Sequence, residues 1–547
     1  MAQPFLRIPP FPGHRARPLA AVGATVVTER EAAEIVRLLR EARVGGDFWG
    51  SQSEMPAGRD ILLAPASRDQ AMEMLEIASR EGLRERCTVI DTIGMGKLGN
   101  AVPTMTGSID WWHAVDTATI VWADAEHDFA LVAGLSGRSV RLFGTSATIG
   151  TADDPAMAAR VGKVIGAWAY ESPFDGNAIS PIEAIELLSG WRKLIDRNRL
   201  ISHVYGVASW KRPTVDSMLW DGTSVSRYTS DVPKALPEGL AVAAWKSRTS
   251  QGLLDRIEER GHSVVEIEDG MIRGRGLGAN CIPPLSIVAD FDGIYFDPAQ
   301  SSDLETLLQT VDMSAALLDR AARLRRAIIE GGVSKYDAGT GLQRIAPEGR
   351  QILVLGQVED DRSVLNGGPG QTNLGLLMRA RQIEPSAWLI YRPHPDVEAG
   401  HRKGYIPDNH ALEYADEIQR GGSISALIEA VDGIHCITSL GGFEALLRGK
   451  NVTTHGVPFY AGWGLTNDLG PIPSRRSRQR SLNELVAATL ILYPTYFDPV
   501  TRLPCPPEIL VDRIARGDDG VAAPLAWLRS SQGKLKVAFR RFWEFAA

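Results

Sequence analysis

From residue 204 onward, short runs of strand-forming residues alternate with amphipathic stretches at helical spacing. The first runs are VYGVAS at 204–209, LAVAAW at 240–245 and VVEI at 264–267, and the stretch SQGLLDRIEERG at 250–261 lies between the last two. Strands that alternate with helices are typical of βαβ units and a parallel sheet. A long helical segment at 302–332 follows and leads to a second set of strands.

The second set continues the same alternation. It comprises the predicted strands QILVLGQ, AWLIYRPH, DGIHCITS and NVTTHG, with the helix FEALLRGK at 443–450. We therefore expect an α/β fold with two Rossmann-like domains, at 201–345 and 346–515, joined near residues 333–350. Ligands in such sheets bind beyond the carboxyl ends of the strands, so polar side chains directly after strands carry the most weight.

Residues 1–200 contain a partial repeat of the second half. GRSV at 137–140 overlays GKNV at 449–452 at an offset of 312. The eight-residue spacing from Pro173 to Pro181 recurs from Pro499 to Pro507 at an offset of 326. A repeat unit of more than 300 residues leaves room in 1–200 only for the last half of a module.

The repeat lacks polar residues that the second half carries. In the ungapped overlay His127 takes the place of Ser439, and Val132 takes the place of Glu444. We interpret residues 1–200 as a degenerate Rossmann-like domain, the remnant of a first module. Chance similarity is the alternative.

Length and composition narrow the class of protein. A chain of 547 residues is too long for one hydrophobic core. No run approaches the roughly 18 apolar residues of a membrane-spanning helix, and a net charge of −7 does not favour a nucleic-acid partner. Pro9, Pro10 and Pro12 interrupt the N-terminus before an apolar signal region forms, so we expect a cytoplasmic protein.

The four cysteines are isolated from one another, without the spacing of a metal site. We expect reduced, buried thiols and no metal.

Four polar clusters each follow a predicted strand directly. They are Glu268-Asp269-Gly270, the run from Gln357 to Asp361, His394-Pro395, and Ser439 with Glu444 one helical turn later. One such cluster alone is more often a helix cap or a turn. Four clusters divided between two domains that face one cleft predict a ligand site.

The segment after the strand DGIHCITS has features of a phosphate site. Ser439 opens a helix, where backbone N–H groups and the helix dipole favour an anion, and Gly441 and Gly442 permit close approach. Glu444 is then placed to accept hydrogen bonds from ribose hydroxyls. A capping role for Ser439 and an exposed Glu444 are the structural alternative.

Several basic or histidine side chains complete the candidate site. His394 is positioned to donate to a leaving phosphate, Pro395 rigidifies the turn, and Arg392 adds charge. Arg273, Arg275 and Lys335 are candidates to hold a sugar carboxylate. Solvent-exposed charge is the commoner role of such residues.

Longer motifs carry a family resemblance. EDGMIRGRGLGANCIPPLSIVADFDGIYFD, SKYD, GQVEDD, YRPHPDV and TSLGGFEALLRGKNVTTHGVPFYAGWGLT occur in this order between residues 204 and 514. Together they resemble the capsule polysaccharide β-Kdo transferases, enzymes that transfer the acidic eight-carbon sugar Kdo. The resemblance implies a GT-B fold, CMP-β-Kdo as donor, retention of configuration, and neither a metal nor a cofactor.

The resemblance also implies roles for individual residues. Retention by double displacement needs a carboxylate nucleophile, for which Asp361 is the candidate and Asp360 the fallback. Glu268 or Asp269 is then the base for the acceptor hydroxyl, with Glu268 slightly favoured. His394, Ser439 and Glu444 match the positions that bind the phosphate and ribose of the nucleotide.

This sequence departs from family members that carry two complete modules, because 1–200 lacks the EDG, GQVEDD and HPD motifs. We expect one active site and an acceptor that is a lipid-linked Kdo or a phosphatidylglycerol-type lipid. The tail at 516–547 ends in the basic, aromatic stretch KLKVAFRRFWEFAA, which suits peripheral contact with the inner face of the cytoplasmic membrane or packing on the protein's own core.

Two other functions remain open from the sequence. The first is a GT-B transferase that uses another nucleotide sugar. The second is a non-catalytic factor in polysaccharide assembly or export that keeps the fold as a scaffold. The five polar residues Glu268, Asp361, His394, Ser439 and Glu444 argue against the scaffold.

Overall fold

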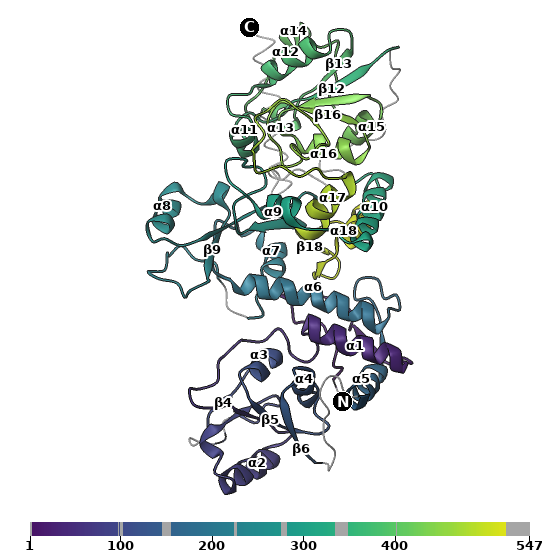
Figure 1. Ribbon diagram of the computed structural model, residues 1–547. Coiled ribbons are helices and arrows are strands. Elements are labelled where there is room, and N and C mark those ends of the chain that lie inside the picture. The colour runs from purple at the N-terminus through teal and green to yellow at the C-terminus, as the bar shows by residue number, and fades with distance from the viewer. Residues whose placement is uncertain are drawn as a thin grey trace. The chain divides into compact units, whose positions relative to one another are not determined.

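The computed structural model describes residues 3–96, 98, 102–144, 155–223, 227–274, 282–333, 348–400 and 402–520 (Figure 1). The chain folds as two compact units. Unit 1 comprises residues 1–200 and 219–226, and unit 2 comprises residues 201–218 and 227–547. Both contain parallel-rich sheets with helices, which confirms the predicted α/β class. Arg275, Lys335 and the basic tail stretch lie outside the described residues.

Unit 1 is built around a five-stranded parallel sheet of order β4-β3-β2-β5-β6 and a small antiparallel pair, β1-β7. Its elements are β1 (Ala20–Val22), α1 (Glu29–Ala42), β2 (Ile61–Ala64), α2 (Arg68–Arg80), η1 (Arg84–Arg86), β3 (Cys87–Ile90), β4 (Thr104–Met105), α3 (Trp111–Asp116), β5 (Ile120–Asp124), α4 (Asp128–Leu135), β6 (Ser139–Phe143), α5 (Pro155–Gly166), β7 (Trp168–Tyr170) and α6 (Pro181–Arg199). Strands β2 and β3 are buried throughout, as expected for a sheet covered on both faces.

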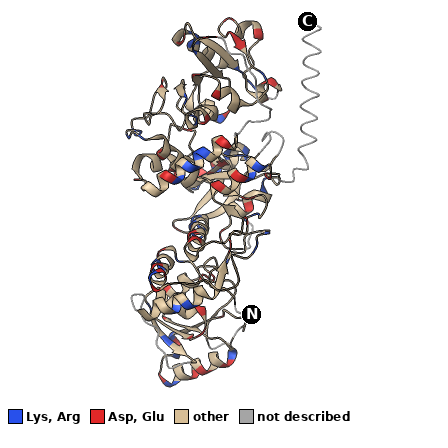
Figure 2. Ribbon diagram, turned by 90° about the vertical axis from the view of Figure 1, so that its right-hand side faces the viewer, with Lys and Arg blue, Asp and Glu red and all other residues tan. Residues whose placement is uncertain are grey.

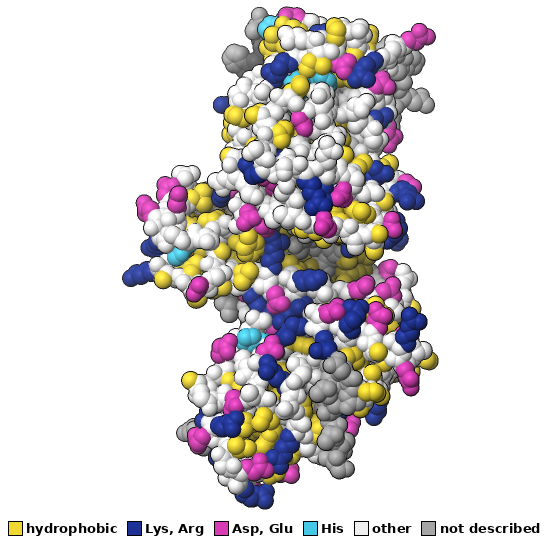
Figure 3. All heavy atoms as spheres, viewed as in Figure 1, with side chains coloured by type: hydrophobic (Ala, Val, Ile, Leu, Met, Phe, Trp, Pro, Cys, Tyr) yellow, Lys and Arg dark blue, Asp and Glu magenta, His cyan; other side chains and the backbone are white. Residues whose placement is uncertain are grey.

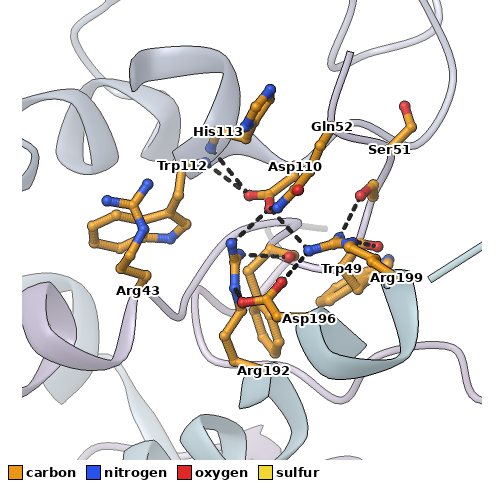
Figure 4. Close-up of polar contacts among 12 residues, drawn as sticks. Arg43, Trp49, Ser51, Gln52, Asp110, Trp112, His113, Arg192, Asp196 and Arg199 are labelled. Carbon is orange, nitrogen blue, oxygen red and sulfur yellow. Dashed lines mark hydrogen bonds and ion pairs between the residues drawn. The ribbon is translucent and has the colours of Figure 1, made fainter. Parts of the chain in front are cut away.

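A buried carboxylate fixes α6 within unit 1. Asp110 is fully buried and caps α3 by accepting from the backbone N–H of Trp112 at 3.1 Å. Figure 4 shows Arg192 and Arg199 of α6 converging on it, and the Arg192 guanidinium lies 2.8 Å from its carboxylate. These contacts give Asp110 a structural role, because they join the start of α3 to α6.

The first sheet of unit 2 is mixed, with the order β19-β18-β11-β10-β9-β8. Strands β8, β9 and β10 are parallel, whereas β11, β18 and β19 are antiparallel to their neighbours. The elements are β8 (Ile201–Tyr205), α7 (Arg212–Met218), β9 (Ala241–Ala244), η2 (Lys246–Arg248), α8 (Gln251–Glu259), β10 (Val264–Asp269), β11 (Ser286–Asp290), α9 (Asp303–Thr310) and α10 (Ala315–Glu330).

The helical segment predicted as one piece at 302–332 is two helices. Helix α9 ends at Thr310, and α10 begins after Ser314, whose side chain accepts from the backbone N–H of Leu317 at 3.3 Å. A serine N-cap in mid-segment satisfies an otherwise unpaired backbone donor and starts a new helix.

The second sheet of unit 2 is wholly parallel, with the order β14-β13-β12-β15-β16-β17. Its elements are β12 (Gln351–Leu355), α11 (Arg362–Gly367), α12 (Asn373–Ile383), β13 (Trp388–Arg392), α13 (Pro395–Glu398), α14 (Asp408–Ala411), β14 (Glu417–Ile418), α15 (Ile424–Glu429), β15 (Gly433–Cys436), α16 (Leu440–Leu447), β16 (Asn451–Thr454) and β17 (Asn467–Asp468). This is the doubly wound order of a Rossmann fold, whose direction reverses between β12 and β15.

The chain then returns to the first sheet. Helix α17 (Leu482–Val486), the π-helix Ala487–Leu492, β18 (Thr495–Phe497), β19 (Pro504–Cys505) and α18 (Pro507–Arg516) complete the unit. Strand β18 pairs with β11, and α17 and α18 pack on α10. The predicted assignment of 346–515 to one domain therefore does not hold for these elements, because strand pairing at long sequence separation leaves no local signal.

Unit 1 repeats the topology of the last half of unit 2. Its sheet order matches β14-β13-β12-β15-β16, and α1, α5 and α6 pack together as α10, α17 and α18 do. Helices α4 and α16 start at the same offset as the sequence overlay, with His127 and Ser439 as their N-caps. Both Pro181 and Pro507 begin the last helix that the structure describes in their unit. The partial repeat is thus a structural one.

Two buried histidines of the second sheet, His435 in β15 and His455 directly after β16, form a hydrogen-bonded chain. The Arg379 Nε–H donates to His455 Nδ1 at 3.1 Å, and His455 Nε2 lies 3.0 Å from His435 Nδ1. Since Arg379 can only donate, the proton of neutral His455 lies on Nε2 and is donated to His435. Burial lowers the pKa of His435 to about 4 and that of His455 to about 3.

We expect these histidines to make the fold acid-sensitive. The unfolded chain binds protons below pH 6.5 whereas the folded chain does not, so stability falls between pH 6.5 and about 4. The slope is about 1.4 kcal/mol per pH unit for each histidine. Urea denaturation at pH 7 and pH 5 measures the change in the free energy of unfolding. His455→Gln, whose amide can keep both hydrogen bonds, should reduce the loss, whereas substitution of exposed His410 with Gln should not.

The surface carries mixed charge in both units. Figure 2 shows basic and acidic residues interspersed along the helices, and Figure 3 shows both kinds among scattered hydrophobic side chains. Within the described ranges, no helix combines the length and apolar composition that a membrane span requires.

Candidate functional site

The loops after β12 and β15 meet where the strand order of the second sheet reverses. The side chain of Gln357 accepts from the Thr438 backbone N–H at 2.8 Å and lies 3.1 Å from the Thr438 hydroxyl. Asn373, at the start of α12, holds the backbone of Gln357 from the other side. Because Gln357 is buried and occupied by these bonds, its observed role is to join the two loops. This reversal is where such sheets bind ligands.

Asp361 and Asp360 differ in their surroundings. Asp361 is half-buried and caps α11, accepting from the Ser363 backbone N–H at 3.0 Å and from its hydroxyl at 2.7 Å. Asp360 is exposed and lies 3.2 Å from the Nε of Arg402. Of the two carboxylates, Asp361 is the more firmly oriented.

His394 caps the short helix α13, with Pro395 as its first residue. Its Nδ1 accepts from the Asp396 backbone N–H at 3.1 Å, so the neutral ring carries its proton on Nε2 and can donate there. The Arg392 guanidinium donates to the carbonyls of Gln419, Gly421 and Gly422. These bonds hold the loop after β14.

Ser439 caps α16 by accepting from the Gly441 backbone N–H at 3.1 Å. Its hydroxyl hydrogen can still be donated, as phosphate recognition requires. Glu444 lies on the same helix but is buried rather than exposed. The predicted cap is therefore present, and the predicted alternative of a solvent-exposed Glu444 is excluded.

The two glycines of this helix are explained by packing. A Cβ at Gly441 would lie 2.7 Å from Leu355, and a Cβ at Gly442 would lie 2.2 Å from the Tyr460 hydroxyl. Tyr460 is fully buried and donates to the Ser439 carbonyl at 2.6 Å. The motifs TSLGGFEALLRGK and PFYAGWG are thus interlocked, with Gly442 making space for Tyr460.

Gly442→Ala should destabilise the protein by about 1–3 kcal/mol through this overpacking. The same substitution at Gly252 meets no atom within 4 Å, so it should be neutral or slightly stabilising. Thermal unfolding of the two variants compares them directly. Equal melting temperatures would contradict the packing explanation.

The carboxylates at the end of β10 lie beside two cations, Lys211, which the sequence did not single out, and the predicted candidate Arg273. Lys211, only 5% exposed, donates to Asp269 at 3.1 Å and lies 3.1 Å from the centre of the Trp245 ring. Arg273 forms an ion pair with the same carboxylate. Burial raises the pKa of Glu268, and nearby Lys211 and Arg273 oppose that increase. Burial also lowers the pKa of Lys211.

A second missed group lies two residues earlier on β10. Glu266 is 1% exposed and pairs with Lys246 at 2.7 Å and with Arg362. Arg362 directly follows Asp361, so this pair joins the first sheet to the loop after β12. A glutamate inside the hydrophobic run VVEIED was the signal that a buried carboxylate needed a partner.

Among the described residues, no three His, Cys, Asp or Glu side chains are grouped so as to hold a metal ion. The described cysteines Cys87 and Cys436 are buried free thiols, and Cys505 is partly buried. Burial raises the pKa of Cys87 and Cys436 to about 11, which keeps both protonated.

Comparison with known proteins agrees with this architecture. The family model "Capsule polysaccharide biosynthesis protein" matches residues 240–340 and 338–496. The lipopolysaccharide-processing protein LpsZ of Rhizobium meliloti is 38% identical over 307 residues, which cover 54% of this chain and 69% of LpsZ. The chain belongs to the capsule polysaccharide biosynthesis family.

Other family members match over similar stretches. The capsule polysaccharide modification protein LipA of Neisseria meningitidis is 39% identical over 339 residues, 61% of this chain. This chain spans about half of LipA, 48% of its length. A solved structure titled beta Kdo 2,4 transferase, from KpsC of Thermosulfurimonas dismutans, matches with 31% identity and a TM-score of 0.51, covering 57% of this chain and 98% of that one.

The family match lies within unit 2, and unit 1 differs at the equivalent strand ends. Thr92 follows β3 by two residues, as His394 follows β13, and His127 follows β5 by three, as Ser439 follows β15. In unit 1 the Thr92 hydroxyl lies 3.1 Å from His127 Nε2. In unit 1, therefore, the residues equivalent to the two candidate phosphate contacts, His394 and Ser439, are hydrogen-bonded to each other.

Proposed function

We propose that this protein is a retaining glycosyltransferase that transfers β-Kdo from CMP-β-Kdo during synthesis of a capsular or other surface polysaccharide. The observation that carries the proposal is the meeting of the loops after β12 and β15, which share a hydrogen bond from Thr438 to Gln357. This chain is similar to the KpsC Kdo transferase structure over 98% of that structure's length, which supports the same class of donor.

In this proposal the sugar donor, CMP-β-Kdo, binds at the strand ends of the second sheet. Ser439 and His394, each the N-cap of a helix that follows a strand, would donate to the phosphate of CMP. Glu444 would accept from the ribose. No metal or other cofactor is invoked, because the phosphate charge would be balanced by these donors and by the dipole of α16.

Asp361 would attack the anomeric carbon and form a covalent sugar ester as CMP leaves. Glu268 would then remove the proton of the acceptor hydroxyl, whose oxygen attacks the same carbon and releases Asp361. Burial already raises the pKa of Glu268, which strengthens it as a base. The second attack inverts the centre again, so the β configuration is retained.

The acceptor in this proposal is a Kdo-terminated or phospholipid-linked glycan, reached by peripheral contact with the inner face of the cytoplasmic membrane. The cations near Glu268, including Lys211 and Arg273, suit an acidic acceptor. One complete site would add one Kdo linkage.

Incubation with freshly generated CMP-Kdo and a β-Kdo-terminated lipid acceptor tests the proposal by mass spectrometry. We expect a single added Kdo. Thermal unfolding provides a second measurement, because CMP at ~100 times its dissociation constant should add about 2.7 kcal/mol of stability, and UDP should not. If the protein showed no transfer and no stabilisation by CMP, the transferase proposal would be rejected in favour of a scaffold.

A further inference from the structure

One ion pair crosses from the first sheet of unit 2 to the loop after β12. Glu266 lies in β10, and Arg362 is the first residue of α11. Successive side chains of a strand alternate between faces, so Glu266 shares a face with Glu268. Arg362 is adjacent in sequence to Asp361, and Glu266 is two residues from Glu268. Asp361 and Glu268 are the two candidate reacting carboxylates.

Three features hold this pair in one geometry. Glu266 is almost fully buried, and Lys246 at 2.7 Å provides a second cation that stabilises its charge. The Arg362 guanidinium also lies over the Phe296 ring, 5.0 Å from its centre. An arginine fixed between a buried carboxylate and an aromatic face has little freedom to move.

Further contacts between the same two parts of unit 2 are ionic as well as aromatic. Arg476 pairs with Glu305 of α9 at 2.7 Å and also donates to the carbonyls of Pro458 and Ala461. Tyr295, from the motif FDGIYFD, packs edge-on against Phe459 of PFYAGWG with ring centres 5.7 Å apart. These rings provide apolar contact without fixing a direction, whereas the ion pairs are directional. Of these contacts, the Arg362–Glu266 pair directly adjoins Asp361, so it is placed to set the position of the Asp361 loop.

We propose that Arg362, through Glu266, is a positioning residue that holds the Asp361 loop at a fixed separation from Glu268. The proposal rests on the proposed function for its effect on transfer. Asp361 and Glu268 must act in turn on one anomeric carbon, and small misplacements of such groups slow a reaction strongly. The pair is a direct ionic contact between β10 and the Asp361 loop, so its loss should loosen the loop against the strand.

Steady-state kinetics of Arg362→Ala, Glu266→Gln and the double variant test the proposal. Each single variant should lower kcat by about 100-fold, with the KM for CMP-Kdo changed less than about threefold. The double variant should be no slower than either single one, because both remove the same contact. Arg362→Lys should recover part of kcat.

The matched control is Arg350→Ala. Arg350 forms a two-point ion pair with Glu384 at 2.8 Å and 3.0 Å, and both residues belong to the second-sheet part of the unit. This variant should retain kcat. A rise in donor KM with unchanged kcat in Arg362→Ala would make Arg362 a donor ligand and overturn the proposal.

A distance measurement separates this proposal from the proposed function. Spin labels on unnatural amino acids at exposed Glu258, in α8, and exposed Leu412, after α14, report the separation of the two parts of unit 2. We expect a narrow distribution in the wild type and a broader one in Arg362→Ala. An unchanged distribution overturns the proposal whether or not the protein transfers Kdo, and a wild type without transfer rejects only the function.

Discussion

Asp361→Asn should abolish Kdo transfer while CMP still binds. An asparagine side chain keeps an oxygen for the Ser363 backbone N–H, so α11 should still be capped. The amide oxygen cannot form the sugar ester that a carboxylate forms. We expect a loss on the order of 10⁴-fold or more, about 5.5 kcal/mol in the activation barrier. Initial rates of product formation and CMP release measure it.

Asp360→Asn is the matched comparison, because it changes the adjacent carboxylate in the same chemical way. Asp360 pairs with exposed Arg402 instead of capping a helix, so its loss should cost far less activity. A larger loss for Asp360→Asn than for Asp361→Asn would transfer the nucleophile's role to Asp360. Thermal stabilisation by CMP should persist in both variants, which separates chemistry from donor binding.

Glu268→Gln should lower transfer by roughly 10²–10⁴-fold, the range expected for loss of a general base. Attack by Asp361 does not need this base, so a sugar adduct should accumulate on the protein and appear as a mass increase. Asp269→Asn is the comparison variant. If Asp269→Asn accumulates the adduct and Glu268→Gln does not, Asp269 is the base.

The pH dependence of kcat/KM provides a second test of Glu268. Its pKa is raised by burial, and a base must be deprotonated to act, so activity should fall on acidification at a pH above the usual range of glutamate. Lys211 lowers this pKa by its charge. Lys211→Met should therefore move the acid limb to higher pH, and a limb that stays in place would contradict the assignment.

Local patterns predicted the strand ends of the second sheet well. Gln357, His394 and Ser439 follow parallel strands, and position in such a sheet is fixed by the strand itself. Patterns could not show what each side chain contacts. Arg392 binds loop carbonyls and Gly442 accommodates Tyr460, and both partners come from distant parts of the chain.

The residues that the sequence missed share a different property. Lys211, Glu266 and Arg362 are charged residues made important by long-range pairing, and single charges in a sequence usually indicate solvent-exposed positions. The break at Ser314 did have a local signal, since a serine that can cap lies within the helical segment. The return of β18 to the first sheet had none.

That return makes the second sheet an insertion within the first part of unit 2. The chain passes into it between α10 and β12 and leaves it between β17 and α17. The part of unit 2 that contains the second sheet is thus attached by two chain crossings, and it can rotate most easily about the line that joins them. Any opening of the donor site would then follow essentially one rotation, so a change at one crossing should alter the entry of donor and the release of CMP together.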